Sequence, residues 1–201
     1  YPWQAKGVLV VTKKNQIELQ IYGEKNTVLT KEGTYLKPGE EQDIVFGMYA
    51  VSDTDVKIVL SIDGEELFNE VVTDSVLVSS ENYFGTLASK GGNSVTLGTM
   101  YTKVDVADLM GSKDDWSLYK EDIQSYGFGA TGMTIASAET SKDYAMAGYI
   151  GDTFQDTVFS FKYKTELPVE NGWSGFYIQS APTKYPWQAK GVLVVTKKNQ
   201  I

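Results

Sequence analysis

Two short segments carry the side chains best suited to binding chemistry: GWSGFYIQS (172–180) and QIELQIY (16–22). Successive side chains of a strand point to opposite faces, so each segment would present aromatic and polar groups together on one face. The candidate ligand-binding residues are Trp173, Tyr177, Gln179, Glu18, Gln20 and Tyr22. Aromatic rings can stack on the apolar face of a sugar, and amide and carboxylate groups can bind its hydroxyls. The same aromatic residues would also suit packing under loops, and that alternative stays open.

The composition excludes several other kinds of chemistry. The chain has no cysteine and no histidine, which removes disulfides, thiolate catalysis, and the commonest general base and metal ligand. Its net charge is -8 and all 18 basic residues are lysine. A nucleic acid is therefore not an expected partner, because the phosphate backbone is repelled and the bidentate arginine contacts to guanine are lacking.

Short runs of valine, threonine, tyrosine and phenylalanine with a period of two, separated by glycine, asparagine and aspartate, predict antiparallel strands. In the second segment Ile17, Leu19 and Ile21 are predicted to face the core, with GVLVVT (7–12) forming a hairpin with it. Asp63 and Gly64 predict a tight turn inside VKIVLSIDGEELFNEVV.

Further strands are predicted at YFGTLAS, SVTLGTMY, GMTIASA, YAMAGYI and DTVFSFKYK, with Gly91 and Gly92 between the first two. Helix signals are few, and the only stretch expected to hold a helical turn is 107–123. Ten or more short strands without intervening helices predict an all-β fold, a two-sheet antiparallel sandwich closed on itself.

These segments resemble the concanavalin A-like lectin and glucanase superfamily when they are taken in a circular order. That order starts at about Trp116, continues to the end of the chain, and then goes on from the beginning of the chain to about Thr99. The likeness is greatest to the laminin-G-like jelly rolls of bacterial surface proteins. DTVFSFKYK is similar to an early core strand of that family, GWSGFYIQS to its glycine-aromatic strand, and VKIVLSIDGEEL to a late strand with an Asp-Gly turn. The resemblance implies a jelly-roll sandwich that is circularly permuted relative to the family order.

The resemblance also bears on the site. Lectins of this type bind sugars on an exposed concave sheet, which agrees with the six candidate residues. Laminin-G-like domains often hold calcium at the rim of the sandwich. The possible oxygen ligands for calcium here are Asp53, Asp55, Asp114 and Asp115. The sequence does not assign the metal ligands among them.

A retaining glucanase needs two carboxylates about 5 Å apart, which the family carries as Glu-x-Asp-x-x-Glu or a close variant. That spacing does not occur in this sequence. IDGEEL comes nearest, but its aspartate is explained by the turn, and Glu65 and Glu66 are expected to be solvated. No catalytic residue is predicted, and the chain is not expected to be an enzyme.

The chain also repeats itself, because YPWQAKGVLVVTKKNQI occurs at 1–17 and again at 185–201. We interpret 1–184 as one repeat period forming the permuted sandwich, and 185–201 as the start of a next repeat or an overlapping strand. A natural tandem array, an engineered permutation and coincidence are the three explanations, and the array is preferred.

The duplication predicts a competition. If the sandwich has one place for the GVLVV strand, two identical segments compete for it, and the loser is free to pair with a neighbouring molecule. Self-association through the duplicated strand is therefore expected.

The sequence as a whole predicts a non-catalytic adhesion or carbohydrate-binding module of a tandem-repeat extracellular protein on a bacterial cell surface. Its partner would be a glycan or another cell-surface ligand, without membrane insertion, because no long apolar run occurs. The alternatives are a structural spacer or self-assembling fibre repeat, and a glycoside hydrolase of the glucanase type.

Overall fold

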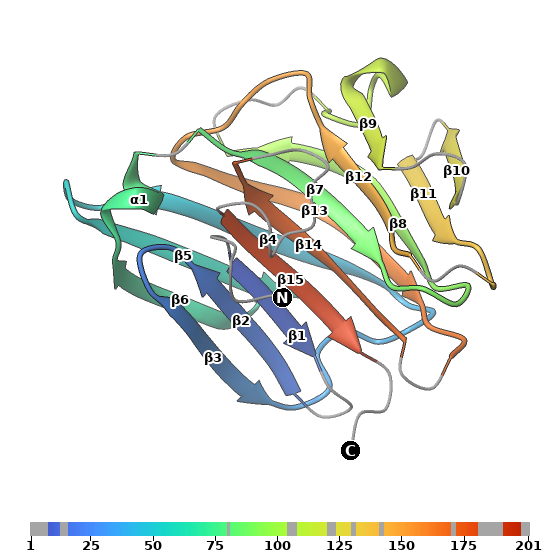
Figure 1. Ribbon diagram of the computed structural model, residues 1–201, viewed down its shortest axis with the longest axis horizontal. Helices are drawn as coiled ribbons and strands as arrows, with labels where there is room; N and C mark the ends of the chain where they lie inside the picture. The colour runs from blue at the N-terminus through green and yellow to red at the C-terminus, as the bar shows by residue number, and fades with distance from the viewer. Residues whose placement is uncertain are drawn as a thin grey trace.

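The computed structural model describes residues 8–12, 16–79, 81–103, 108–119, 124–129, 132–140, 143–169, 172–180 and 191–197. The chain forms two β-sheets (Figure 1). The eight-stranded sheet contains, in order, β3 (Asn26–Glu32), β2 (Gln16–Tyr22), β1 (Val8–Thr12), β15 (Gly191–Lys197), β14 (Trp173–Gln179), β7 (Tyr83–Ala88), β12 (Ala145–Tyr149) and β9 (Trp116–Tyr119). The seven-stranded sheet contains β10 (Gln124–Gly129), β11 (Gly132–Ser137), β8 (Ser94–Thr102), β13 (Thr157–Glu166), β4 (Glu41–Ala50), β5 (Asp55–Ile62) and β6 (Glu65–Thr73). The predicted all-β class is confirmed.

The core lies between the two sheets and is joined by phenylalanine rings. Phe176 on β14 contacts Phe46 on β4 and Phe161 on β13, with ring centroids 5.2 and 5.1 Å apart. Phe84 on β7 lies 5.1 Å from Phe161 and 4.9 Å from Phe159. Edge-to-face and tilted pairs of this kind add to the stabilisation from burying apolar area. Each sheet therefore has one face in the core and one outer face.

The local patterns that were sharpest in the sequence appear in the structure. Asp63 and Gly64 form the turn between β5 and β6, with φ angles of 50° and 81°. The aspartate side chain makes this left-handed conformation tolerable by accepting the backbone N–H of Asp43 at 2.8 Å. Gly91 and Gly92, with φ of 92° and 80°, separate β7 from β8 as expected.

The helical turn was predicted only in part. A short 3₁₀ turn, Lys113–Asp115, does lie within 107–123. The α-helical turn, α1 (Ser75–Val78), lies elsewhere and was missed. Its signal is Asp74, a buried N-cap whose carboxylate accepts the backbone N–H groups of Val76 and Leu77.

The equivalent strands of the two copies, β1 and β15, lie in the same sheet, which contradicts the predicted competition for one place. β1 and β15 are neighbours and run parallel, with identical residues opposite each other from Leu9↔Leu193 to Thr12↔Thr196. β15 pairs with β14 on its other side, and β1 pairs with β2. Among the strand pairs of the described residues, β1 with β15 is the parallel one and the others are antiparallel.

The physical reason is that neither sheet closes on itself, contrary to the expectation of a closed sandwich. The eight-stranded sheet has β3 and β9 at its ends, and the seven-stranded sheet has β10 and β6. An open sheet can widen by one strand, because the added strand satisfies its backbone groups on both sides. The eight-stranded sheet therefore contains β1 from residues 1–184 and β15 from residues 185–201.

Candidate functional site

All six candidate ligand-binding residues lie on the eight-stranded sheet, on the face opposite the core. The register links the two groups, because Tyr177 pairs with Leu193, Leu193 with Leu9, and Leu9 with Gln20. β1 and β15 separate β2 from β14, so the groups are about 14 Å apart at the usual strand spacing. The hairpin is not directly beside β14 as the sequence suggested, and the candidates form two regions rather than one.

The region on β2 is a row of mutually bonded polar side chains, here called the polar row: Gln16, Glu18, Gln20 and Tyr22. The amide groups of Gln16 and Gln20 donate to the two oxygens of Glu18 at 2.6 and 2.8 Å. The Tyr22 hydroxyl donates to Oε1 of Gln20 at 2.7 Å. The predicted alternation of β2 is confirmed, since Ile17, Leu19 and Ile21 are buried in the core.

Burial governs the electrostatics of this row. Glu18 and Tyr22 are only 7% and 9% exposed. Burial, and secondly the neighbouring Glu18 carboxylate, raise the pKa of Tyr22 to about 12, because both disfavour a phenolate. Groups that are buried and bonded to one another in this way mainly hold the strand in place.

The region on β14 is centred on Tyr177, whose side chain is 0% exposed although it lies outside the main core. Its ring lies over Gly85 of the neighbouring strand β7, where an added Cβ would be 2.1 Å from Cζ of Tyr177. Its hydroxyl reaches the next strand and donates to the Ala147 carbonyl at 3.4 Å. Burial raises the pKa of Tyr177 well above its usual range. Glycine at 85 is what allows the ring to lie across β7.

Tyr177 belongs to a second apolar cluster on the outer face, the outer aromatic cluster. Its buried members are Leu87, Met146 and Tyr177, and the half-buried members packed against them are Tyr119, Tyr144 and Trp173. They come from four consecutive strands and the residue before β12. The ring centroids of Tyr144 and Trp173 are 5.1 Å apart. Burial raises the pKa of Tyr144, and Asp143 adds to the rise.

The backbone beneath Trp173 is fixed by a small buried network. Ser89 N–H donates to the Trp173 carbonyl and Ser89 Oγ accepts the Trp173 N–H, each at 2.8 Å. Asn93 donates to Ser89 Oγ at 2.9 Å, and Ser137 Oγ donates to the Ser89 carbonyl at 2.7 Å. Because Ser89, Asn93 and Ser137 are all buried, the tryptophan is carried on a rigid support.

The remaining candidate on β14, Gln179, is 0% exposed and so offers no surface to a ligand in this arrangement. Trp173 and Gln20 are the two of the six that are only half-buried. Tyr119 and Tyr144 were missed from the sequence. Tyr119 carried a usable signal, because it follows the core residue Trp116 at the odd spacing that places it on the opposite face. The duplicated YPWQAK carries Trp3 and Trp187, which the sequence predicts to lie in a loop at the rim of the sandwich, and both are outside the described residues.

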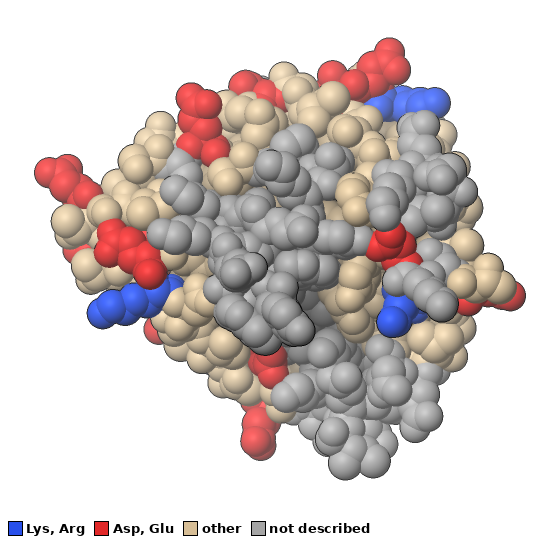
Figure 2. Space-filling model, in the orientation of Figure 1, with Lys and Arg blue, Asp and Glu red and all other residues tan. Residues whose placement is uncertain are grey.

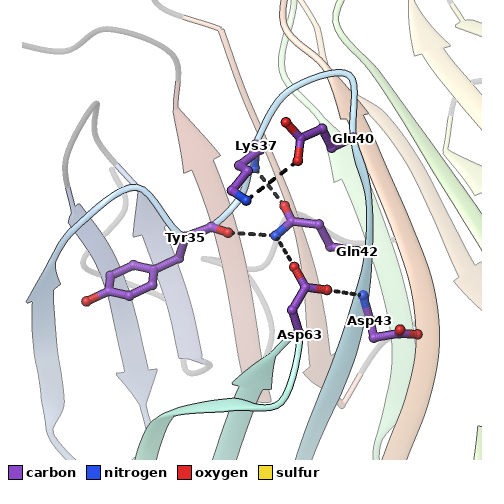
Figure 3. A network of polar contacts seen from close by, with 6 residues as sticks. All are labelled: Tyr35, Lys37, Glu40, Gln42, Asp43 and Asp63. Carbon is purple, nitrogen blue, oxygen red and sulfur yellow. Dashed lines mark hydrogen bonds and ion pairs between the residues drawn. The ribbon is translucent and has the colours of Figure 1, made fainter.

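Asp63, the aspartate of IDGEEL, serves the fold. Asp63 accepts Gln42 Nε2 at 2.8 Å as well as the Asp43 N–H, and these bonds lower its pKa (Figure 3). Gln42 is itself buried, and it also bonds the backbone of Tyr35 and Lys37. The network therefore ties the loop before β4 to the β5–β6 turn, which confirms a turn at IDGEEL.

Asp55, one of the four calcium candidates, is likewise bonded to nearby side chains. Thr73 and Ser52 hydroxyls donate to Asp55 at 2.6 and 2.7 Å and lower its pKa. Within the described ranges, no group of three or more acidic side chains is placed to hold a metal ion. Calcium binding stays a prediction.

Figure 2 shows acidic side chains mostly toward the outline of the described surface, in the orientation that places β14 and β15 in front in Figure 1. The helices that the structure describes include none long and apolar enough to cross a membrane.

No protein-family model matches this chain, and a comparison with curated proteins finds no significant relative.

Proposed function

We propose that this protein is a non-catalytic carbohydrate-binding or adhesion module whose ligand surface is the outer aromatic cluster. The observation that carries the proposal is the Trp173–Tyr144 pair, half-buried on the outer face and supported by buried Leu87, Met146 and Tyr177. Two aromatic faces held on a rigid apolar base suit stacking against a pyranose ring, and they cost little conformational entropy on binding.

The finer fold belongs to the same proposal. The two open antiparallel sheets with a shared core agree with a concanavalin A-like jelly roll, permuted so that the family order begins near Trp116. The meander β14, β15, β2 and β3 would then be continuous in the parent order, with one copy of the duplicated strand. We place the module in a tandem-repeat extracellular protein of a bacterial surface, which the repeated segment supports.

One observation favours a second function, a structural repeat that assembles with its own copies. The duplicated strands lie side by side in register, and four of the six candidate residues, Glu18, Tyr22, Tyr177 and Gln179, are buried. A surface fibre or spacer module would need the strands and no ligand. The glycoside hydrolase is the weaker alternative, because two acids of IDGEEL, Asp63 and Glu66, accept hydrogen bonds from Gln42 and Asn69.

A glycan array separates the first two functions. The wild-type protein is expected to bind one class of glycan, and Trp173→Ala is expected to remove that signal. Tyr101→Ala is the matched control, since Tyr101 is an aromatic residue 39% exposed on the other sheet. Circular dichroism of each variant checks folding. An absence of binding by the wild type, or equal loss in both variants, would contradict the proposal.

A further inference from the structure

The pairing of β1 with β15 brings together two copies of one sequence. Leu9, Val10, Val11 and Thr12 lie opposite Leu193, Val194, Val195 and Thr196. We propose that the place of β1, between β15 and β2, is a strand-acceptor site for the GVLVVT segment of a second copy of this chain. The proposal concerns assembly and is independent of the carbohydrate site.

In the described residues, β1 has fewer paired positions with its neighbouring strands than β15 has. Among the described residues, it pairs with β2 at Val8↔Ile21 and Leu9↔Gln20, and with β15 at four positions. β15 pairs with β14 along seven positions, from Trp173↔Lys197 to Gln179↔Gly191. Parallel pairs are also slightly less stable per residue than antiparallel ones. Of the two copies, β1 is therefore the one more easily replaced.

The strand on the other side of the site does not depend on β1. β2 places Ile17, Leu19 and Ile21 in the core with almost no exposure. Its far edge pairs with β3, from Gln16↔Glu32 to Glu18↔Thr30. When β1 leaves, β2 and β15 thus remain as two strand edges with unpaired backbone groups, which are templates for another strand.

The acceptor site prefers the GVLVVT segment because an incoming strand of the same sequence as β1 can take the same register with β15 and β2. A second chain brings GVLVVT at 7–12 and at 191–196, so every molecule is both donor and acceptor.

The donor molecule can reclose its own sheet. Because residues 1–17 and 185–201 are identical, the Val8↔Ile21 and Leu9↔Gln20 pairs can be remade as Val192 with Ile21 and Leu193 with Gln20. β15 would then join β14 and β2 directly in an all-antiparallel sheet. A donor that recloses in this way ends the assembly, whereas a donor whose site between β15 and β2 takes the strand of a further copy extends it head to tail.

Disulfide trapping tests the exchange in the full chain, which is free of native cysteine. Val10→Cys and Val194→Cys are made in separate molecules, mixed, and oxidised, since Val10 and Val194 are register partners. The expected product is a disulfide-linked dimer containing one molecule of each variant. Its yield should be at least fivefold above that of Val10→Cys mixed with Val195→Cys, which is one residue out of register and faces the other side of the sheet.

Two further experiments, a competing peptide and a double variant in one chain, make the result decisive. A peptide of residues 1–17 should suppress the mixed dimer, whereas a scrambled peptide of the same composition should not. Equal suppression by both peptides would show that the site accepts any strand and would overturn the specificity.

The double variant Val10→Cys/Val194→Cys in one chain should form its disulfide within the monomer. If it does so while the mixture yields no cross-linked dimer at any protein concentration, β1 stays in its own sheet and the proposal is wrong. If the double variant forms no disulfide, the parallel pair itself is wrong.

Discussion

The polar row on β2 and the outer aromatic cluster around β14 share one face of one sheet, yet they differ in what their side chains bond to. Glu18 takes the amides of Gln16 and Gln20, and Tyr22 bonds Gln20. The aromatic cluster keeps Trp173, Tyr119 and Tyr144 half-buried around an apolar base.

The difference teaches that residue types alone do not identify a binding surface. Glutamate, glutamine and tyrosine suit sugar hydroxyls, but in the polar row they are already bonded to one another. A ligand would have to replace those bonds without net gain, because exchanging one hydrogen bond for another contributes little free energy. The aromatic cluster instead carries the half-buried rings of Trp173 and Tyr144 on a buried apolar base.

The largest expected effect lies under the aromatic cluster. Gly85→Ala would place a Cβ against the Tyr177 ring and should reduce the free energy of unfolding by about 3 kcal/mol, the upper range for overpacking. Gly127→Ala is the matched control, since a Cβ there meets nothing within 4 Å. Urea unfolding of both variants measures the difference. Equal stabilities would mean that Tyr177 does not lie over β7.

The next effect is a pH dependence in the polar row. An unfolded tyrosine ionises near pH 10, whereas the pKa of Tyr22 in the fold is about 12. Between these values the unfolded state binds fewer protons, so stability is intact below pH 10 and falls as the pH rises to 12. Tyr22 should contribute a slope of up to about 1.4 kcal/mol per pH unit.

Tyr22→Phe isolates that contribution, because it removes the ionisable group and keeps the ring. Unfolding free energies at several values between pH 10 and 12 should fall less steeply for this variant than for the wild type. Parallel slopes would show that Tyr22 titrates normally and that the row is open to solvent.

A smaller effect is expected from the acid at the centre of the row. Glu18→Ala deprives two glutamine amides of their acceptor and should cost about 1–2 kcal/mol. Glu32→Ala on the neighbouring strand should change stability by less than about 0.5 kcal/mol, since Glu32 is exposed. Thermal denaturation compares the two. A Glu18 variant as stable as the Glu32 variant would remove the structural role given to the polar row.

The sequence predicted features whose cause is local. Asp63-Gly64 requires a tight turn, and the period-two pattern of β2 buries Ile17 and Leu19 wherever the strand is placed. The α1 turn was missed although its cause is also local, because a single capping aspartate, Asp74, is a weak signal beside the strand pattern.

Features that depend on neighbouring strands were not predictable. The burial of Tyr177 depends on a glycine 92 positions earlier in the chain, Gly85, which only the strand order places beside it. The doubled strand was misjudged for a similar reason: identity of 1–17 and 185–201 shows that the segments fit the same neighbours, but only an open sheet makes room for both.

The most direct test of the contrast between the two regions is a pair of dissociation constants for a glycan that binds on the array. Trp173→Ala in the aromatic cluster is expected to weaken binding at least tenfold, about 1.4 kcal/mol, while Gln20→Ala in the polar row leaves it within twofold of the wild type. Undiminished affinity in Trp173→Ala, or a loss confined to Gln20→Ala, would contradict the assignment of the ligand surface to the aromatic cluster.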